Sequence, residues 1–297
     1  MSFSSETKAE LCREPLQKRC CALAEAYGVL LYCNMFTADE IRIVTSSAEL
    51  TEHLPKLFKK AFGLGFDAVP SADIKGKQTF SITNKEHIKH IFESYGYEAS
   101  GILAHHINLE VLENDCCKAA FLRGAFLAGG SITDPTKSYH LELVTDHYNV
   151  SRETFSILLE LGFSPKDASR GGNYVIYFKQ SEAIEDFFTL MGAPLSAMDI
   201  MSAKVEKDMR NVVNRCVNCD SANADKIVLA AQDQLEAIRR IERTTGLDDL
   251  PEKLRETALL RIANPEASLT DLAALAIPAV SKSCISHRLR KLMEYIG

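Results

Sequence analysis

Alternating apolar and polar residues appear at two places in the first 200 residues, at 41–45 and at 141–145. The segments read Ile-Arg-Ile-Val-Thr and Leu-Glu-Leu-Val-Thr, which predicts two short strands with one buried face each. Helical apolar spacing follows both of them, at 48–62 and 149–161. The same strand-then-helix order about 100 positions apart indicates an internal repeat.

The repeat continues downstream. Second strands are expected at 78–83 and 174–179, and a last helix in each copy ends at a glycine suited to a left-handed cap, Gly96 or Gly192. Each copy is therefore expected to contain, in this order, a helix, a pair of strands, a second helix, a second pair of strands and a third helix. Two such units are expected to pair about a pseudo-twofold axis, with helices covering one face of each sheet.

Each copy opens with an apolar helix that carries two adjacent cysteines, six further residues and a glycine, at 20–28 and 116–124. Small residues beside Gly124 suggest a close helix crossing, because a glycine there lets two backbones approach. Gly28 occupies the same place in the first copy, so the two helices are expected to cross at these glycines.

The last third of the chain has a purely helical pattern. Helices are expected at 199–214 and 224–242, the second with Asn223 as its N-cap. The polar tract between them, 211–223, is interpreted as a hinge made rigid by side-chain bonds to the backbone. The alternative is phosphate contact through Arg210, Arg215 and Lys226.

Three shorter helices follow. The first spans 254–263 and stops at Asn264-Pro265. The second starts with the capping-box pattern at 268–271 and runs through Leu275, and a turn at 276–280 leads to the third, capped by Ser281 or Ser283. Four apolar residues of the third helix share a narrow arc that should face the core: Ile285, Leu289, Leu292 and Ile296.

The opposite face of this last helix is polar and basic, which is typical of a recognition helix in a helix-turn-helix. Arg290 suits a guanine edge and Lys282 and Lys291 suit phosphates. The alternative is a solvated face of an ordinary three-helix bundle. The candidate DNA-binding residues are Ser281, Lys282, Ser283, Ser286, His287, Arg288, Arg290 and Lys291.

Charge supports placing any DNA contact in this last third. The chain has 297 residues, 46% of them hydrophobic, and a formal net charge of −6, which argues against a protein that coats nucleic acid along its whole length. Residues 205–297 hold 14 basic and 14 acidic residues, and the remainder holds 20 and 26. We expect no membrane span and no signal peptide, hence a cytoplasmic, nucleoid-associated protein.

The nine cysteines indicate free thiols in a reducing compartment. Cys216-x-x-Cys219 has zinc spacing, but no second pair follows it. The adjacent pairs at 20–21 and 116–117 are expected to point to different faces of their helices. We therefore interpret the cysteines as small buried apolar residues, with redox sensing as the alternative, and expect no metal and no cofactor.

Three separated motifs occur in order along the chain. The first is the stretch 116–131, Cys-Cys-Lys-Ala-Ala-Phe-Leu-Arg-Gly-Ala-Phe-Leu-Ala-Gly-Gly-Ser. The second is the polar tract 214–223, and the third comprises 280–283 and 287–292. Together they resemble the WhiA family of bacterial sporulation and cell-division regulators. The resemblance covers nearly the whole chain and implies a degenerate LAGLIDADG homing-endonuclease domain followed by a helix-turn-helix.

On this basis the fold class is α+β, a duplicated αββαββα domain followed by an all-α domain. The expected boundaries are 1–198 for the LAGLIDADG-like domain, 199–224 for a linker and 225–297 for the helix-turn-helix domain. The two repeats are expected at about 14–98 and 110–194.

The resemblance also bears on catalysis. In LAGLIDADG enzymes the motif helix ends in an acid that binds the catalytic metal, and the matching positions here are Cys33 and Gly129. Neither provides the oxygen ligand that a hard cation needs. Asp39 and Asp134 lie in the following turns and leave residual endonuclease activity as an alternative. The expected function is thus that of a sequence-specific regulator of transcription that binds double-stranded DNA and has no enzyme activity. The resemblance implies that it acts in cell division, chromosome segregation or sporulation.

The duplicated domain is expected to modulate DNA binding or recruit a protein rather than grip DNA. The strand residues that face away from the helices are Arg42, Val44, His140, Glu142 and Val144, a mixed surface without a basic stripe. A protein-interaction scaffold that no longer binds DNA is the remaining alternative.

Overall fold

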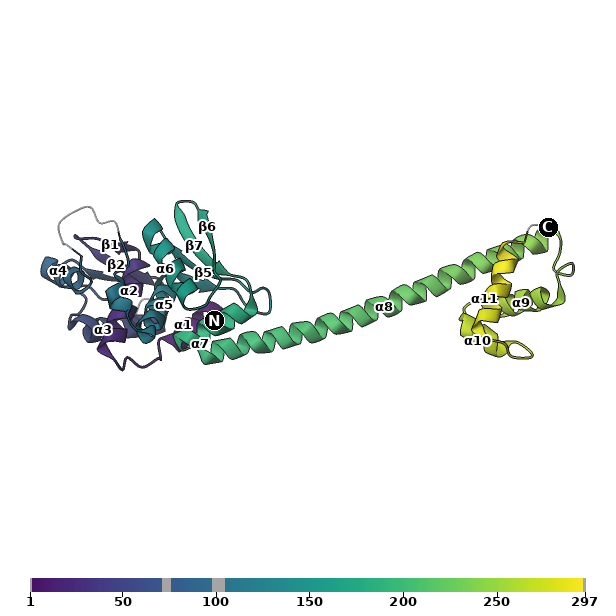
Figure 1. The fold of residues 1–297 in the computed structure, drawn as a ribbon, viewed down its shortest axis with the longest axis horizontal. Coiled ribbons are helices and arrows are strands. Elements are labelled where there is room, and N and C mark those ends of the chain that lie inside the picture. Colours follow the sequence, from purple (N-terminus) through teal and green to yellow (C-terminus); the bar gives the residue numbers. More distant parts are fainter. Residues whose placement is uncertain (1, 71–75, 98–104, 296–297) are drawn as a thin grey trace. The chain divides into compact units, whose positions relative to one another are not determined.

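The computed structural model describes residues 2–70, 76–97 and 105–295. The chain divides into two compact units, Met1–Asp208 and Met209–Gly297 (Figure 1). Each unit is described by itself.

The first repeat forms a three-stranded antiparallel sheet with helices against it. The order of the strands is β1-β2-β3, and Ile43 of β2 pairs with Phe80 of β3. Ile41 and Ile43 are buried, as the alternation predicts. The elements are α2 (Arg19–Leu31), β1 (Met35–Phe36), β2 (Ile41–Thr45), α3 (Ala48–Phe62), β3 (Gln78–Ile82) and α4 (Lys85–Ser94).

The second repeat follows the same order with one more strand, β6, and forms a four-stranded sheet, β4-β5-β7-β6. In the described part of the first repeat, the place of β6 is taken only by an isolated bridge between Ala68 and Ser81. Leu141 and Leu143 of β5 are buried against helices, again as predicted. The elements are α5 (Asp115–Gly129), β4 (Gly130–Ile132), β5 (Leu141–Thr145), α6 (Tyr148–Glu160), β6 (Lys166–Arg170), β7 (Asn173–Phe178) and α7 (Ser181–Met191). The duplicated α+β fold is confirmed, with α1 (Phe3–Leu11) and a 3-10 turn at Leu109–Leu112 as additions that the pattern did not predict.

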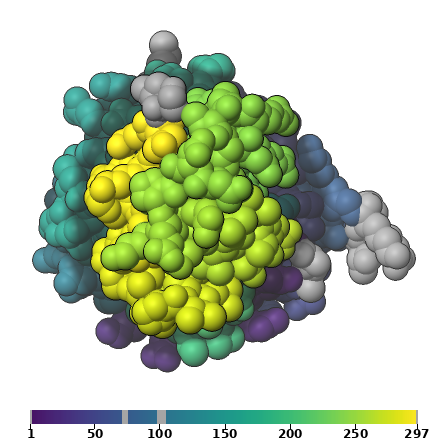
Figure 2. All heavy atoms as spheres, turned by 90° about the vertical axis from the view of Figure 1, so that its right-hand side faces the viewer, coloured from purple at the N-terminus to yellow at the C-terminus, as the bar shows by residue number. Residues whose placement is uncertain are grey.

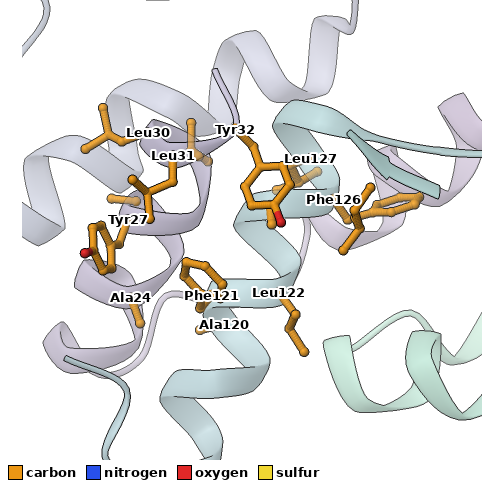
Figure 3. Close-up of a cluster of buried hydrophobic side chains, with 14 of the residues drawn as sticks. Ala24, Tyr27, Leu30, Leu31, Tyr32, Ala120, Phe121, Leu122, Phe126 and Leu127 are labelled. Atoms are coloured by element: carbon orange, nitrogen blue, oxygen red, sulfur yellow. The ribbon is translucent and has the colours of Figure 1, made fainter. Parts of the chain in front are cut away.

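The core of this unit lies where α2 packs on α5. A Cβ atom on Gly124 would lie 2.0 Å from the carbonyl oxygen of Glu25, and one on Gly28 would lie 2.1 Å from that of Phe121. The two glycines therefore sit at the predicted close crossing. Aromatic and aliphatic side chains fill the space around it, among them Tyr27 and Phe121 (Figure 3).

The helix α8 runs without a break from Pro194 to Thr244, 51 residues. The predicted interruption at 211–223 is wrong, and Asn223 is not an N-cap, because residues 195–245 contain neither proline nor glycine. Asparagine, serine and aspartate reduce helix propensity by only a fraction of a kcal/mol each and do not end a helix. The predicted linker 199–224 therefore lies inside α8.

No helix in the described part of the chain is long and apolar enough to cross a membrane.

The second unit packs the end of α8 on three short helices, α9 (Glu252–Ala263), α10 (Leu269–Leu275) and α11 (Lys282–Met293). The helix α10 begins with the predicted capping box between Ser268 and Asp271. The core of this second unit joins Ile238 of α8 to side chains of the three short helices. These are Ala258, Leu272, Ala273, Ile285, Leu289 and Leu292. Ile296, which we placed on the same arc, lies outside the described residues.

Candidate nucleic-acid interface

The helix α11 is held in place by the turn that precedes it. The backbone N–H of Val280 donates to the carbonyl oxygen of Ala273 at 3.1 Å, which joins the turn to α10. The Oγ of Ser281 accepts from the N–H of Cys284 at 3.3 Å, so Ser281 is the N-cap and Ser283 is not. Capping fixes where α11 starts, and with it which side chains face outward.

Burial of one face of α11 exposes the other. Ile285, Leu289 and Leu292 are at most 1% exposed. The side chains on the outward face are exposed, as the helical spacing predicts: Lys282, Ser283, Ser286, His287, Arg290 and Lys291. Within the described residues no carboxylate lies at ion-pair distance from the three cations among them. Their charge is therefore free to meet an anionic ligand.

Two other candidates are placed differently. Ser281 is exposed, but its oxygen is engaged in the helix cap and lies 3.0 Å from the Oγ of Ser283. Arg288 is only half-exposed and lines a pocket of about 550 Å³ beside α9, with Glu252 and Glu256 on the pocket wall. Two acidic residues make this pocket a poor phosphate site, so Arg288 is the least suited of the eight to contact DNA.

The sequence analysis overlooked two arginines of α8 next to α11. Arg240 donates through Nη2 to the carbonyl oxygen of Met293 at 3.5 Å, and the end of α8 lies alongside α11 (Figures 1 and 2). Arg240 and Arg243 are exposed and line one surface groove together with Met293. The available signal was the run Arg239-Arg240-x-x-Arg243, which the sequence analysis did not consider.

At the end of the motif helices there is no room for a metal-binding acid. A Cβ atom at Gly129 would lie 2.5 Å from the carbonyl oxygen of Val144 and 2.9 Å from the ring of Tyr32. At the matching position the thiol of Cys33 donates to the carbonyl oxygen of Leu30 at 3.1 Å, and burial raises its pKa to about 12. A protonated, hydrogen-bonded thiol does not bind a hard cation.

The two neighbouring aspartates are engaged elsewhere. Asp39 is exposed and lies 3.7 Å from Lys85. Asp134 accepts from the N–H and the hydroxyl of Thr136 at 2.9 and 2.6 Å, and these bonds lower its pKa. Asp134 thus stabilises its own turn, whereas Asp39 only forms an exposed ion pair with Lys85 of α4.

The strand faces directed away from the helices carry paired charges. Arg42 donates to Glu40 at 2.6 Å and Arg170 lies 3.6 Å from Glu142. His140 lies 3.3 Å from the same Glu142. Neutralised in this way, the surface is mixed rather than basic.

A buried charge cluster at the α2–α5 crossing escaped the sequence analysis. Glu25, 1% exposed, accepts from Arg123 at 2.9 Å and lies 2.6 Å from Nε2 of His53. Arg123 also donates to the carbonyl oxygen of Met191 at 2.7 Å. The signal was a charged residue in the apolar second half of each helix, Glu25 in α2 and Arg123 in α5. The cluster joins α2, α3, α5 and α7, and each of its charges is partnered, as buried charges must be.

The interpretation of the cysteines as small buried apolar residues is wrong for several of them. Cys117 is buried, but Cys20 and Cys116 are exposed, and the two adjacent pairs meet. The Sγ atoms of Cys20, Cys21 and Cys117 all lie within 4.8 Å of one another, and the thiol of Cys116 interacts with that of Cys21. The pairs meet because α2 and α5 cross with their first turns side by side. By contrast, Cys216 and Cys219 are exposed on α8.

Comparison with known proteins identifies both parts of the chain. Residues 118–210 match the family model for the WhiA LAGLIDADG-like domain, and residues 213–296 match that for the WhiA C-terminal HTH domain. The probable cell division protein WhiA of Ruminiclostridium cellulolyticum is 39% identical over 303 residues, which cover 99% of this chain and 96% of the relative. The protein of the same description from Desulfitobacterium hafniense (strain Y51) is 38% identical over 303 residues, 99% of this chain and 95% of its own.

Solved structures agree on the fold. The full-length DUF199/WhiA from Thermatoga maritima aligns with a TM-score of 0.62 at 24% identity, over 99% of this chain and 97% of the other. The N-terminal LAGLIDADG domain of DUF199/WhiA aligns with a TM-score of 0.50 at 20% identity, over 64% and 92%.

Proposed function

This chain belongs to the WhiA family, and we propose that it is a sequence-specific DNA-binding regulator that reads double-stranded DNA with α11. We further propose that it regulates transcription, and that the process is cell division, as the names of its relatives suggest, or chromosome segregation or sporulation. The observation that carries the proposal is the exposed, unpaired polar face of α11 on a capped helix that follows α10 and a turn.

The chemistry of this face fits a major groove. Arg290 has the planar fork that pairs with the O6 and N7 atoms of guanine, and Ser286 and His287 can donate to or accept from base edges. Lys282 and Lys291 provide point charges for phosphates. In the groove beside α11 three arginines, Arg240 and Arg243 among them, outnumber the acidic Asp233 and Glu236, so we include these two as phosphate contacts.

The experiment is a titration of duplex DNA with wild type, Arg290→Ala and Lys291→Ala, on a site selected from a random pool and on random duplex. Arg290→Ala should weaken binding to the selected site by about 1–3 kcal/mol and relax the preference at one base pair. Lys291→Ala should weaken binding to both DNAs alike and lower the salt slope by about one unit. Equal losses for both variants on both DNAs would show that α11 does not read bases.

For the N-terminal unit we propose no nuclease activity. Support comes from the position of Gly129, where an acid would collide with the backbone of Val144. Plasmid DNA should stay intact with Mg²⁺ or Mn²⁺, and Gly129→Asp should not introduce cleavage. Nicking by wild type that disappears in Asp39→Asn or Asp134→Asn would establish the endonuclease alternative.

We propose instead that the duplicated domain modulates DNA binding or takes a protein partner, in the cytoplasm at the nucleoid. The paired charges of its strand faces support this assignment over direct grip of DNA. Crosslinking in cells, with peptides mapped to this unit, tests for the partner, and crosslinks to DNA alone from the strand residues would contradict the assignment.

A further inference from the structure

Four thiols meet at the first turns of α2 and α5, one pair from each repeat. Cys20 is the second residue of α2 and Cys116 the second residue of α5. The interactions cross between the repeats, Cys20 with Cys117 and Cys21 with Cys116. The 96-residue offset of the repeat exchanges these two contacts, so the cluster has the pseudo-symmetry of the domain.

We propose that this cluster is a binding site for one zinc ion, held by Cys20, Cys21, Cys116 and Cys117. A tetrahedral tetrathiolate zinc has Zn–S bonds of about 2.3 Å, which places its sulfur atoms about 3.8 Å apart. Three of the four Sγ atoms already lie within 4.8 Å of one another. A small contraction thus brings these three sulfur atoms to bonding geometry.

The fourth ligand is Cys116. Its side chain is exposed, so surrounding atoms do not fix its rotamer, and it already interacts with Cys21. When the site fills, each thiol releases one proton as its sulfur bonds to the metal, and no electrons are transferred.

The surroundings admit an ion. The four cysteines lie in the first turns of α2 and α5, where the positive end of each helix dipole favours a thiolate. A surface pocket of about 430 Å³ runs past Cys21 and Cys116 and provides an entry path. Four soft sulfur ligands select zinc over magnesium or calcium, which take oxygen.

A bound zinc ion would tie the two repeats together close to their crossing. The same pair of helices carries Gly28 and Gly124, where the backbones touch, and the buried Glu25–Arg123 pair. The ion would thereby stabilise the N-terminal unit, because a ligand that binds only the folded state raises its stability.

The test uses the reduced full-length protein, stripped of metal with a chelator and titrated with Co²⁺ and then Zn²⁺. Wild type should bind one Co²⁺ with the strong visible absorption of a tetrahedral tetrathiolate complex, and Zn²⁺ should displace it. Zn²⁺ should also raise the melting temperature. The variant Cys20→Ser/Cys116→Ser changes two exposed residues and should lose more than about 100-fold in Zn²⁺ affinity, beyond the loss from mutating outer-shell residues alone.

The matched control is Cys216→Ser/Cys219→Ser, which removes the other closely spaced thiols and should bind like wild type. Retained tetrathiolate absorption in Cys20→Ser/Cys116→Ser, or its loss in the control, would overturn the assignment. So would a wild-type protein that binds no Co²⁺ when all nine thiols are reduced. Disulfides between the pairs in protein isolated under non-reducing conditions, without zinc, would replace the metal site by a redox site.

Discussion

At the residue scale, two glycines decide how closely the repeats can pack. Carbonyl oxygens of the facing helix lie where Cβ atoms would be, at 2.0 Å for Gly124 and 2.1 Å for Gly28. Both neighbours are backbone atoms in the middle of helices, so neither can move aside without moving a helix. The matching glycines in the two copies indicated this contact from the sequence alone, since a small residue at the same place in a repeat predicts a close approach.

We therefore expect Gly124→Ala to destabilise the N-terminal unit. The added methyl group overpacks the crossing, at a cost of about 1–3 kcal/mol or more. Chemical denaturation followed by near-ultraviolet circular dichroism measures the loss. Gly65→Ala is the matched control, because nothing lies within 4 Å of its Cβ position. Equal stability of the two variants would show that the helices can separate at little cost.

A second residue-scale prediction concerns pH. His105 is 7% exposed and stacks on Phe36 with ring centroids 5.2 Å apart. Burial, and secondly the nearby His147, lower its pKa to about 4. Between the pKa of an unfolded histidine, about 6.5, and this value, the unfolded state binds a proton that the folded state does not. Stability should therefore fall as pH drops from about 6.5 to 4, by at most about 3.4 kcal/mol.

The measurement is the free energy of unfolding across this pH interval for wild type and His105→Gln. The variant should have a shallower slope, whatever its stability at neutral pH. His90→Gln changes an exposed histidine and should keep the wild-type slope. If His105→Gln also keeps the wild-type slope, folding does not lower the pKa of His105.

At the scale of the element, the alternation of apolar and polar residues predicted the strands more accurately than any other pattern predicted its elements. The expected segments 41–45 and 141–145 agree with β2 and β5 residue for residue, because a one-residue slip would turn every apolar side chain out of the core. The contacts between elements were beyond the sequence. Glu25 and His53 are 28 residues apart and Cys20 and Cys117 are 97 apart, so only the crossing of helices brings each set together.

The helix α8 shows why composition misled the sequence analysis. Its residues 211–230 are exposed on every side, so no tertiary packing supports them. The helix is buried only near its ends, as at Ile200 and Ile238. A polar, asparagine-rich tract has weak helix propensity, yet propagation from both ends needs only the absence of proline and glycine.

We predict that the middle of α8 opens more readily than its ends. Amide hydrogens of 211–226 should exchange at least about 10-fold faster than those of 235–244, where Ile238 and Ile241 are buried. Asn218→Ala should slow exchange in the middle and Asn218→Gly should speed it, without effect at the ends. Uniform protection along the helix would mean that something packs on 211–226 in solution.

At the scale of the whole molecule, net charge does not show where positive charge is free to bind an anion. What matters is which cations lack a carboxylate partner. The first 204 residues carry 20 basic and 26 acidic residues, and the strand-face arginines Arg42 and Arg170 are paired with carboxylates. Residues 205–297 are neutral overall, with 14 of each sign, but the cations of α11 are unpaired in the described part of the chain. A phosphate backbone responds to such unpaired local charge, since binding there displaces counterions without breaking an ion pair.

The last prediction follows from this difference. Lys282→Ala/Lys291→Ala should lower the affinity of the full chain for duplex DNA and reduce the slope of log K against log salt by about 1.8, close to 0.9 for each lost phosphate contact. Arg42→Ala/Arg170→Ala removes the same number of charges from the strand faces, where both are already neutralised, and should change neither quantity. Titrations at several salt concentrations on one duplex compare the two variants directly. A reduced slope in Arg42→Ala/Arg170→Ala would mean that the duplicated domain keeps hold of DNA, whereas a reduced slope in Lys282→Ala/Lys291→Ala alone assigns the contact to α11.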